Sequence, residues 1–238
     1  MGSSVLLVHG AYHGGWCWDA VQRLLAEREI RSRAPDLPLT GFGNDVDALR
    51  SAVVDLRRSG PVTLVAHSYA GIVATAAGHH ADRLIYVAAR LPLPGESQAA
   101  LTPRWNVHPG LHAATTTDPD GWSRVEAAAQ AAFYPDCAPD VAAAAMARLR
   151  PMRSAVPVDP VDPPAWTHLP SAYVVCARDA VVRVDRQRER AALADHHYEL
   201  DSGHSPFLSV PEALTGILVE QAGLTTALSE GSPATTHE

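Results

Sequence analysis

The chain has 238 residues, of which 47% are hydrophobic and 19% charged, and its net charge is −7. This length suits one large α/β domain with a sizeable buried core. Acidic residues outnumber basic ones by 26 to 19, and no run of basic residues is longer than Arg57-Arg58. These features exclude nucleic acid as a main partner. Because no apolar run approaches the roughly 18 residues of a membrane span, no membrane association is expected.

The N-terminal residues and the cysteines indicate the compartment. Residues 1–8 lack the basic region and the long apolar stretch of a secretory signal. The three cysteines, Cys17, Cys137 and Cys176, are odd in number and far apart, and no C-x-x-C metal pair occurs. We therefore expect free thiols, no disulfide framework, no metal and a cytoplasmic protein.

Four short, nearly continuous apolar runs are typical of strands, and they cover residues 5–8, 62–66, 84–88 and 172–176. Apolar and polar residues do not alternate in them, which favours strands buried on both faces of a parallel sheet. Helical periodicity fills the gaps between the runs. This order of strands and helices predicts a doubly wound, mostly parallel α/β sheet.

The helical segments are marked by apolar stripes and by their end signals. One stripe consists of Val46, Leu49, Val53 and Leu56. It predicts a helix with Asn44 as its N-cap and Gly60-Pro61 beyond its end. A similar stripe begins at Trp18, and the last predicted helix carries Pro211 in its first turn.

The middle of the chain, residues 91–170, is rich in proline and lacks a clear strand. It predicts a helical or irregular insertion between two strands. This insertion is either a peripheral subdomain with its own small core or a cap whose aromatic residues line an apolar pocket. We expect a core of residues 1–90 and 171–223, a cap insertion at 91–170 and a flexible tail at 224–238.

The strongest motif is the segment Ala66-His67-Ser68-Tyr69-Ala70, which directly follows a predicted strand. It matches the nucleophile elbow, with Ala66 and Ala70 where glycine is commoner. Because such a turn is sharp, only small side chains fit two positions before and after the nucleophile, and Ser68 projects clear of the sheet. The helix expected to follow favours developing negative charge at its N-terminus. The alternative is a plain buried serine in a strand–helix turn.

A second motif, Val8-His-Gly-Ala-Tyr-His-Gly-Gly-Trp16, follows the first predicted strand. An acyl-transfer enzyme needs backbone N–H groups aimed at the carbonyl oxygen as it becomes an oxyanion. We expect one such N–H from Tyr69 and the other from Ala11 or its neighbour. The alternative is a phosphate-binding loop, but the spacings of the G-x-G-x-x-G motif and of the P-loop are both missing.

A nucleophilic serine needs a base, and His204 is the leading candidate for Ser68. It lies just before the last predicted helix, where a loop imidazole could reach the hydroxyl. His67 is adjacent to the serine, but its side chain is expected to point away across the elbow. The histidine pairs at 79–80 and 196–197 have no metal-ligand spacing, so we interpret them as surface or structural residues.

The base in turn needs a carboxylate that fixes its tautomer. Asp179 lies just beyond the fourth predicted strand and is the preferred residue, while Asp185 and Asp201 are its rivals. The chain order Ser68, Asp179, His204 is the order expected of an α/β-hydrolase.

Five segments carry a family resemblance: Leu7-Val-His-Gly-Ala-Tyr-His-Gly-Gly-Trp-Cys-Trp18, Ala34-Pro-Asp-Leu-Pro38, Ala66-His-Ser-Tyr-Ala-Gly71, Arg90-Leu-Pro-Leu-Pro-Gly-Glu-Ser97 and Gly203-His204. Over residues 5–223 the sequence resembles an α/β-hydrolase. More narrowly, it resembles the branch that holds plant methyl-ester esterases, the salicylate-binding esterase, hydroxynitrile lyases and their bacterial relatives. The resemblance implies a helical cap over an apolar pocket and no cofactor. It also implies a triad of Ser68, His204 and Asp179, with an oxyanion hole formed by the N–H groups of Ala11 and Tyr69.

Two departures separate the chain from the lyases of this branch. Hydroxynitrile lyases carry threonine or asparagine in place of Gly10, and those with threonine place a lysine after the catalytic histidine. This chain has Ser205 there. Without a positive group the leaving cyanide would be poorly stabilised, so the pattern favours the esterases.

We therefore expect a carboxylic-ester hydrolase that acts on a small-to-medium apolar ester through an acyl-enzyme. The expected partner is a small-molecule substrate, and a homodimer is left open. Two alternatives also stay open: a non-hydrolytic lyase or cyclase on the same scaffold, and a low-turnover receptor for a small ligand. The residues expected to line the substrate pocket are Gly10, Tyr12, His67, Trp105, Trp122 and Phe133.

Overall fold

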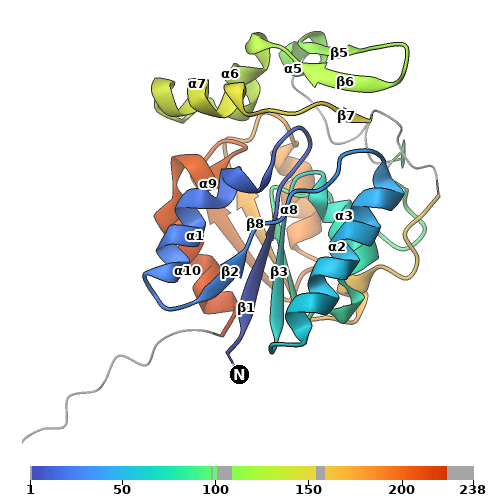
Figure 1. Ribbon diagram of the computed structural model, residues 1–238, viewed down its shortest axis with the longest axis vertical. Helices are drawn as coiled ribbons and strands as arrows, with labels where there is room; N and C mark the ends of the chain where they lie inside the picture. Colours follow the sequence, from blue (N-terminus) through green and yellow to red (C-terminus); the bar gives the residue numbers. More distant parts are fainter. Residues whose placement is uncertain (1, 98, 101–108, 154–158, 224–238) are drawn as a thin grey trace, which may run out of the picture.

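The chain folds into a large sheet flanked by helices, with a smaller layer on top of it (Figure 1). The computed structural model describes residues 2–97, 99–100, 109–153 and 159–223. Trp105 and the expected tail at 224–238 lie outside the described residues. The prediction of a doubly wound, mostly parallel α/β sheet is confirmed.

The large sheet has six strands, and every neighbouring pair in it is parallel. Their spatial order is β2 (Arg31–Arg33), β1 (Ser4–Val8), β3 (Val62–His67), β4 (Arg83–Val87), β8 (Ser171–Cys176) and β9 (His196–Leu200). In the central register, Val8 of β1 lies opposite Ala66 of β3. Parallel pairing brings the carboxyl ends of these strands, and the loops that follow them, to one edge of the sheet.

Alternate residues of the central strands enter two separate hydrophobic clusters. Leu6 and Val8 pack on one face, whereas Val5 and Leu7 pack on the other. The first face is covered by α2 (Phe42–Arg57), α3 (Ala70–Ala77) and α8 (Val184–Ala191). The second is covered by α1 (Asp19–Ala26), α9 (Pro206–Ser209) and α10 (Pro211–Gln221). Burial on both faces explains why these strands carry continuous apolar runs.

The elements at the edges and ends differ from the prediction. The two edge strands, β2 and β9, were not expected, because both are largely polar and partly exposed. Helix α2 begins at Phe42 after Gly41, so Asn44 lies inside its first turn and is not its N-cap. Gly41 has a φ of 137°, a conformation that glycine adopts without strain and that starts the helix earlier than the apolar stripe indicates.

The smaller layer comes from the middle of the chain and contains strands, so the prediction of an insertion without strands is wrong. Its helices and strands are α5 (Pro109–Ala113), β5 (Thr115–Thr117), β6 (Trp122–Val125), α6 (Gln130–Phe133), α7 (Pro139–Ala147) and β7 (Met152–Arg153). The three strands pair antiparallel. Each is at most four residues long and partly exposed, so none contains the apolar run that marks a buried strand.

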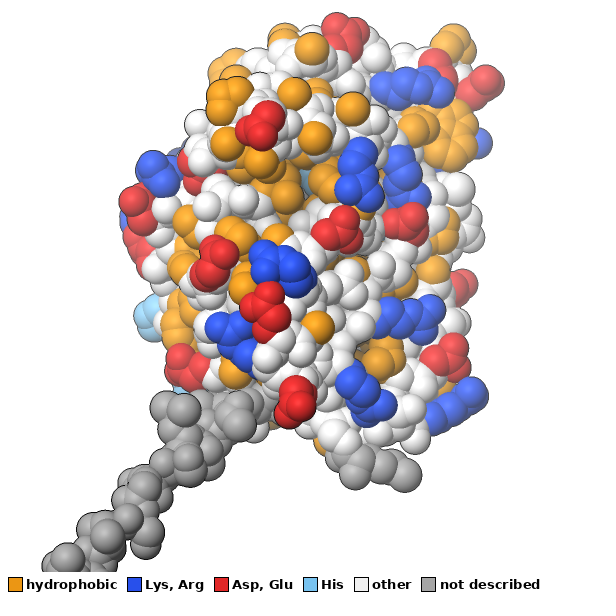
Figure 2. Space-filling view, turned by 60° about the vertical axis from the view of Figure 1, so that its left-hand side comes forward, with side chains coloured by type: hydrophobic (Ala, Val, Ile, Leu, Met, Phe, Trp, Pro, Cys, Tyr) orange, Lys and Arg blue, Asp and Glu red, His pale blue; other side chains and the backbone are white. Residues whose placement is uncertain are grey.

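Short 3-10 helices complete the fold: η1 (Gly15–Trp18), η2 (Gly78–His80), η3 (Ala127–Ala129) and η4 (Ala165–Thr167). Figure 2 shows acidic and basic side chains interspersed over one face of the molecule. None of the helices in the described part of the chain has the length and apolar character needed to cross a bilayer.

Candidate active site

Ser68 lies in the sharp turn between β3 and α3. Its φ is 53°, in the left-handed region that residues other than glycine rarely adopt. The backbone holds this conformation on both sides, because the N–H of Ser68 donates to the carbonyl of Val87 at 3.2 Å and its own carbonyl accepts from Arg90 N at 3.1 Å. A Cβ on Gly71 would lie 2.3 Å from the carbonyl oxygen of Arg90, so the turn fits against the segment after β4 only without a side chain there.

The structure brings Ser68, His204 and Asp179 together, although they lie far apart in the sequence. Nε2 of His204 is 3.1 Å from Oγ of Ser68, and Nδ1 of His204 is 2.8 Å from Oδ2 of Asp179. The carboxylate can only accept, so Nδ1 carries the proton and Nε2 accepts the serine O–H. We call this chain of two hydrogen bonds the relay. The exposed fraction is 8% for Ser68, 6% for Asp179 and 1% for His204, so the relay is nearly closed to water.

The carboxylate of Asp179 is held by four hydrogen bonds in all. Oδ1 accepts the N–H groups of Val181 and Val182, at 2.7 and 2.9 Å. Oδ2 accepts Nε2 of Gln187 at 2.8 Å besides Nδ1 of His204. These partners satisfy both oxygens and fix the plane of the carboxylate.

Gln187 is a residue of the site that sequence reasoning missed. Its side chain is fully buried on α8, and its Oε1 accepts the N–H of Cys176 at 3.0 Å. A single glutamine within a charged helix carries no local signal for such a role. The rival carboxylates Asp185 and Asp201 instead form exposed ion pairs with Arg183 and Arg178.

The loop after β1, residues 9–15, is held by hydrogen bonds to four successive carbonyl oxygens. Nδ1 of His9 bonds to Gly10 O at 2.8 Å, and Nδ1 of His13 bonds to Ala11 O at 2.7 Å. The backbone N–H of Arg150 donates to the carbonyl of Tyr12 at 2.7 Å. The Arg150 guanidinium donates twice to the carbonyl of His13, at 2.9 and 3.0 Å. Among the described residues, the N–H groups of Ala11 and Tyr69 donate to no acceptor.

Three buried histidines surround the relay without taking part in it. Burial lowers the pKa of His9 to about 4 and that of His13 to about 3, and it holds the pKa of His67 well below its usual value. All three are therefore neutral near pH 7. His9 accepts the N–H of Leu37 at 2.9 Å, and His13 accepts the hydroxyl of Tyr134 at 2.8 Å.

The residues predicted to line the substrate pocket differ in how they lie relative to the relay. Phe133 stacks 6.1 Å from the ring of His204 and lies 6.4 Å from the ring of Tyr12. A Cβ on Gly10 would lie 2.9 Å from Cβ of Ser68, so the loop passes directly beside the serine. His67 is fully buried, and its Nε2 is 2.8 Å from the backbone carbonyl of His204.

Trp122 lies on β6, where the Arg153 guanidinium covers its ring at 5.0 Å. The described contacts therefore do not bring it to the relay, and its role in the pocket stays a prediction. Trp105 lies outside the described residues.

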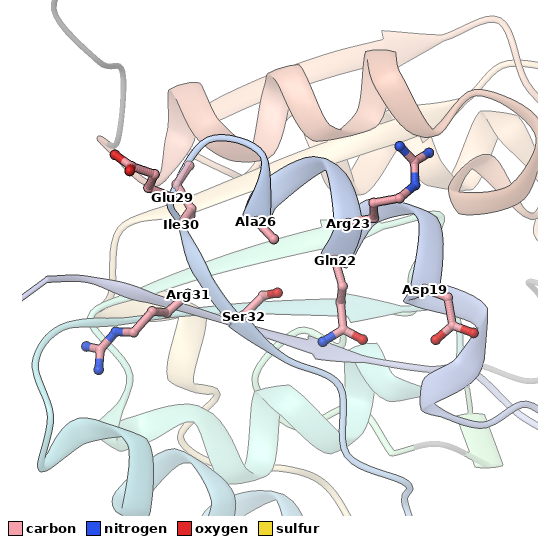
Figure 3. Close-up of a pocket in the computed structure, with 8 residues that line it drawn as sticks. All are labelled: Asp19, Gln22, Arg23, Ala26, Glu29, Ile30, Arg31 and Ser32. Carbon is pink, nitrogen blue, oxygen red and sulfur yellow. The ribbon is translucent and has the colours of Figure 1, made fainter.

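A surface pocket of about 650 Å³ lies elsewhere, between α1 and β2 (Figure 3). Its eight lining residues are Asp19, Gln22, Arg23, Ala26, Glu29, Ile30, Arg31 and Ser32. None of them was predicted as a site residue. Within the described residues, no group of His, Cys, Asp and Glu side chains could hold a metal ion, and the three cysteines are free thiols.

Comparison with known proteins identifies the family. The sequence pattern of the alpha/beta hydrolase family matches residues 5–216. "Probable hydrolase R7" of Phoma sp. is 28% identical over 79% of this chain and 81% of its own length. The pFDCC methylesterase MES16 of Arabidopsis thaliana is 29% identical over 90% and 92%. A crystal structure of a pyrethroid hydrolase from Sphingobium faniae JZ-2 superposes with a TM-score of 0.72, at 20% identity, over 94% of this chain and 99% of that one.

These matches bear on the fold and on the type of activity. The structural match, at its low identity, shows the fold alone. The sequence matches extend along most of the chain and include proteins named as a hydrolase and a methylesterase. The resemblance stated from the sequence motifs is thus confirmed. The chain is an enzyme of esterase type, and it belongs to the alpha/beta hydrolase family.

Proposed function

We propose that the chain is a serine carboxylesterase that hydrolyses a small-to-medium apolar ester through an acyl-enzyme. The observation that carries the proposal is the relay of hydrogen bonds from Asp179 through His204 to Ser68. A serine hydroxyl becomes an effective nucleophile when a base lies within hydrogen-bond reach and a third group orients that base. The strained backbone of Ser68 gives further support, because such strain is typical of functional sites.

In the proposed reaction, Oγ of Ser68 attacks the ester carbonyl carbon while Nε2 of His204 takes the hydroxyl proton. The carbonyl oxygen becomes an oxyanion that accepts the N–H groups of Ala11 and Tyr69, and Asp179 stabilises the imidazolium. His204 then protonates the leaving alcohol, and an acyl-enzyme remains. A water molecule that gives a proton to His204 attacks this acyl group and releases the acid.

The proposed substrate class follows from the surroundings of the relay. The aromatic ring of Phe133 stacks on the side of His204, and Tyr12 lies beside it. We propose that the layer of residues 109–153 acts as a cap over the substrate and that these rings contact the apolar part of the ester. Ser205, next to the base, is buried and carries no charge, so a leaving anion such as cyanide would find no positive group there. This supports ester hydrolysis over a lyase reaction.

The proposal is tested first by a fluorophosphonate probe that reacts with activated serines. The intact mass of the protein should increase by one adduct, and the Ser68→Ala variant should not react. A wild-type protein whose mass does not change, or a Ser68→Ala variant that reacts equally well, contradicts the proposal.

The reaction class is tested by hydrolysing methyl and p-nitrophenyl esters of varied acyl length in H₂¹⁸O. One ¹⁸O atom should enter the acid product, and Ser68→Ala should lose the activity. An unlabelled product would indicate a lyase or cyclase. Saturable binding without turnover, unchanged in Ser68→Ala, would indicate a receptor.

A further inference from the structure

The segment Tyr134-Pro135-Asp136, which we name the bridge segment, follows α6 in the smaller layer, which we call the upper layer from here on. It contacts the loop of residues 9–15 and the loop that carries His204. The hydroxyl of Tyr134 donates to Nε2 of His13 at 2.8 Å. Because Nε2 accepts, Nδ1 of His13 carries the proton and donates to the carbonyl of Ala11 at 2.7 Å. Burial raises the pKa of Tyr134, so its hydroxyl stays protonated and the direction of this chain is fixed. One end of the bridge segment is thus connected to the proposed oxyanion residue.

The other end of the bridge segment contacts the loop that carries the base. Oδ2 of Asp136 accepts the N–H of Gly203, the residue before His204, at 2.6 Å. It also lies 3.7 Å from the guanidinium of Arg178, the residue before Asp179. A hydrogen bond from an N–H to a carboxylate is short and stronger than one to a neutral acceptor. Asp136 therefore contacts the immediate neighbours of two members of the relay.

The bridge segment packs closely against the loop that carries His204. A Cβ on Gly203 would lie 2.7 Å from Oδ1 of Asp136 and 2.8 Å from Cγ of Pro135. The absence of a side chain on Gly203 thus leaves room for the side chains of Pro135 and Asp136. The preceding residue, Phe133, adds the ring contact with His204 at 6.1 Å and an edge contact with His13 at 5.4 Å.

We propose that Tyr134 and Asp136 are positioning residues for the hydrolysis reaction. From the upper layer they fix the loop of residues 9–15, which includes Ala11, and the loop that carries His204. The inference rests on the proposed function. Neither residue touches the reacting atoms; Tyr134 acts through His13, and Asp136 acts through Gly203. The upper layer therefore completes the catalytic geometry as well as covering the substrate. Misplacing a catalytic group by about 1 Å costs about 100-fold in rate.

The kinetic test compares Asp136→Ala with Asp136→Asn. The alanine variant leaves the N–H of Gly203 without its acceptor, and kcat should fall about 10- to 100-fold with little change in KM. The asparagine variant keeps an acceptor oxygen and should retain kcat within about threefold of the wild type. Equal losses in both variants, or wild-type kcat in Asp136→Ala, would overturn the proposal.

Two matched controls separate positioning from loss of stability. Asp118 also accepts the backbone N–H of Trp122 and pairs with Arg124, but these contacts stay within the upper layer. Asp118→Ala should leave kcat unchanged. Tyr134→Phe should lower kcat, whereas Tyr86→Phe, which removes the buried hydroxyl bonded to Thr75, should not. Control variants that lose as much kcat as their counterparts would overturn the proposal.

A second readout does not depend on ester hydrolysis. Amide hydrogen exchange at Gly203, followed by NMR, should be slow in the wild type and in Asp136→Asn and much faster in Asp136→Ala. The proposed function fails if the wild type hydrolyses no ester and Ser68 takes no fluorophosphonate. The positioning inference fails separately if Gly203 exchanges equally slowly in Asp136→Ala.

Discussion

The turn at Ser68 and the loop of residues 9–15 meet at the relay, but they are held in different ways. The turn is held by close packing: its backbone bonds to β4, and Gly71 fits against the carbonyl of Arg90. The loop is held by polar contacts, some of them from Arg150, which is 137 positions away from His13 in the sequence. Packing of small residues leaves a short local signature, whereas long-range hydrogen bonds leave none.

The largest effect is expected where the packing of the turn is broken. In Gly71→Ala, the new Cβ would lie 2.3 Å from the Arg90 carbonyl oxygen, which is backbone and cannot swing aside. We expect the free energy of unfolding to fall by about 3 kcal/mol. Urea denaturation measures it. Gly216→Ala is the control, because that helical glycine has open space around it and alanine should not destabilise it.

The next effect tests the point where the two regions touch. A Cβ on Gly10 would lie 2.9 Å from Cβ of Ser68 and 2.9 Å from Nδ1 of His67. Gly10→Ala should push the loop away from the serine, so we expect kcat to fall about 10- to 100-fold, with a smaller loss of stability than in Gly71→Ala. Gly43→Ala, with no atom near the added methyl group, should keep wild-type kcat. A Gly10→Ala enzyme with normal kcat would show that the loop can move without cost.

Particular residues explain how much of this structure could be predicted. The central strands and the turn at Ser68 were found because burial on two faces and steric crowding restrict the local sequence. The edge strand β9, with exposed His196 and His197, was missed because an edge strand gains its structure from pairing with β8. The chain order Ser68, Asp179, His204 could be predicted because Ser68 and Asp179 lie just beyond apolar runs that mark strands. Gln187 was missed because its role depends on which side of α8 faces Asp179.

A moderate effect is expected when the long-range contacts of the loop are removed. Arg150→Ala deletes the donors to the carbonyls of His13 and Leu37. We expect kcat to fall about tenfold, because the loop then samples more conformations, while KM stays within about twofold. Arg148→Ala is the matched control, since that exposed arginine contacts Asp19 at 3.4 Å and the Trp16 ring at 4.7 Å without bonding to a loop carbonyl. If both variants lose the same activity, the loop does not depend on Arg150 in particular.

Between pH 7 and pH 6 the smallest effect is the dependence of stability on pH that the buried histidines create. In the folded chain the pKa of His9 is lowered to about 4 and that of His13 to about 3, mainly by burial. In the unfolded chain both should take the ordinary value of about 6.5. Below pH 6.5 the unfolded chain therefore binds more protons, and the folded state loses stability as the pH falls towards 4.

Each of these histidines should contribute at most about 1.4 kcal/mol to the loss per pH unit. The measurement is the free energy of unfolding in urea at pH 7, 6 and 5, for the wild type and for His13→Gln. The variant should show the shallower slope, and the difference between the two slopes removes the contribution of carboxylates common to both. His196→Gln, at an exposed position on β9, should keep the wild-type slope. Equal slopes in the wild type and His13→Gln would mean that the loop opens to water before the chain unfolds, so that polar contacts would hold it less firmly than packing holds the turn at Ser68.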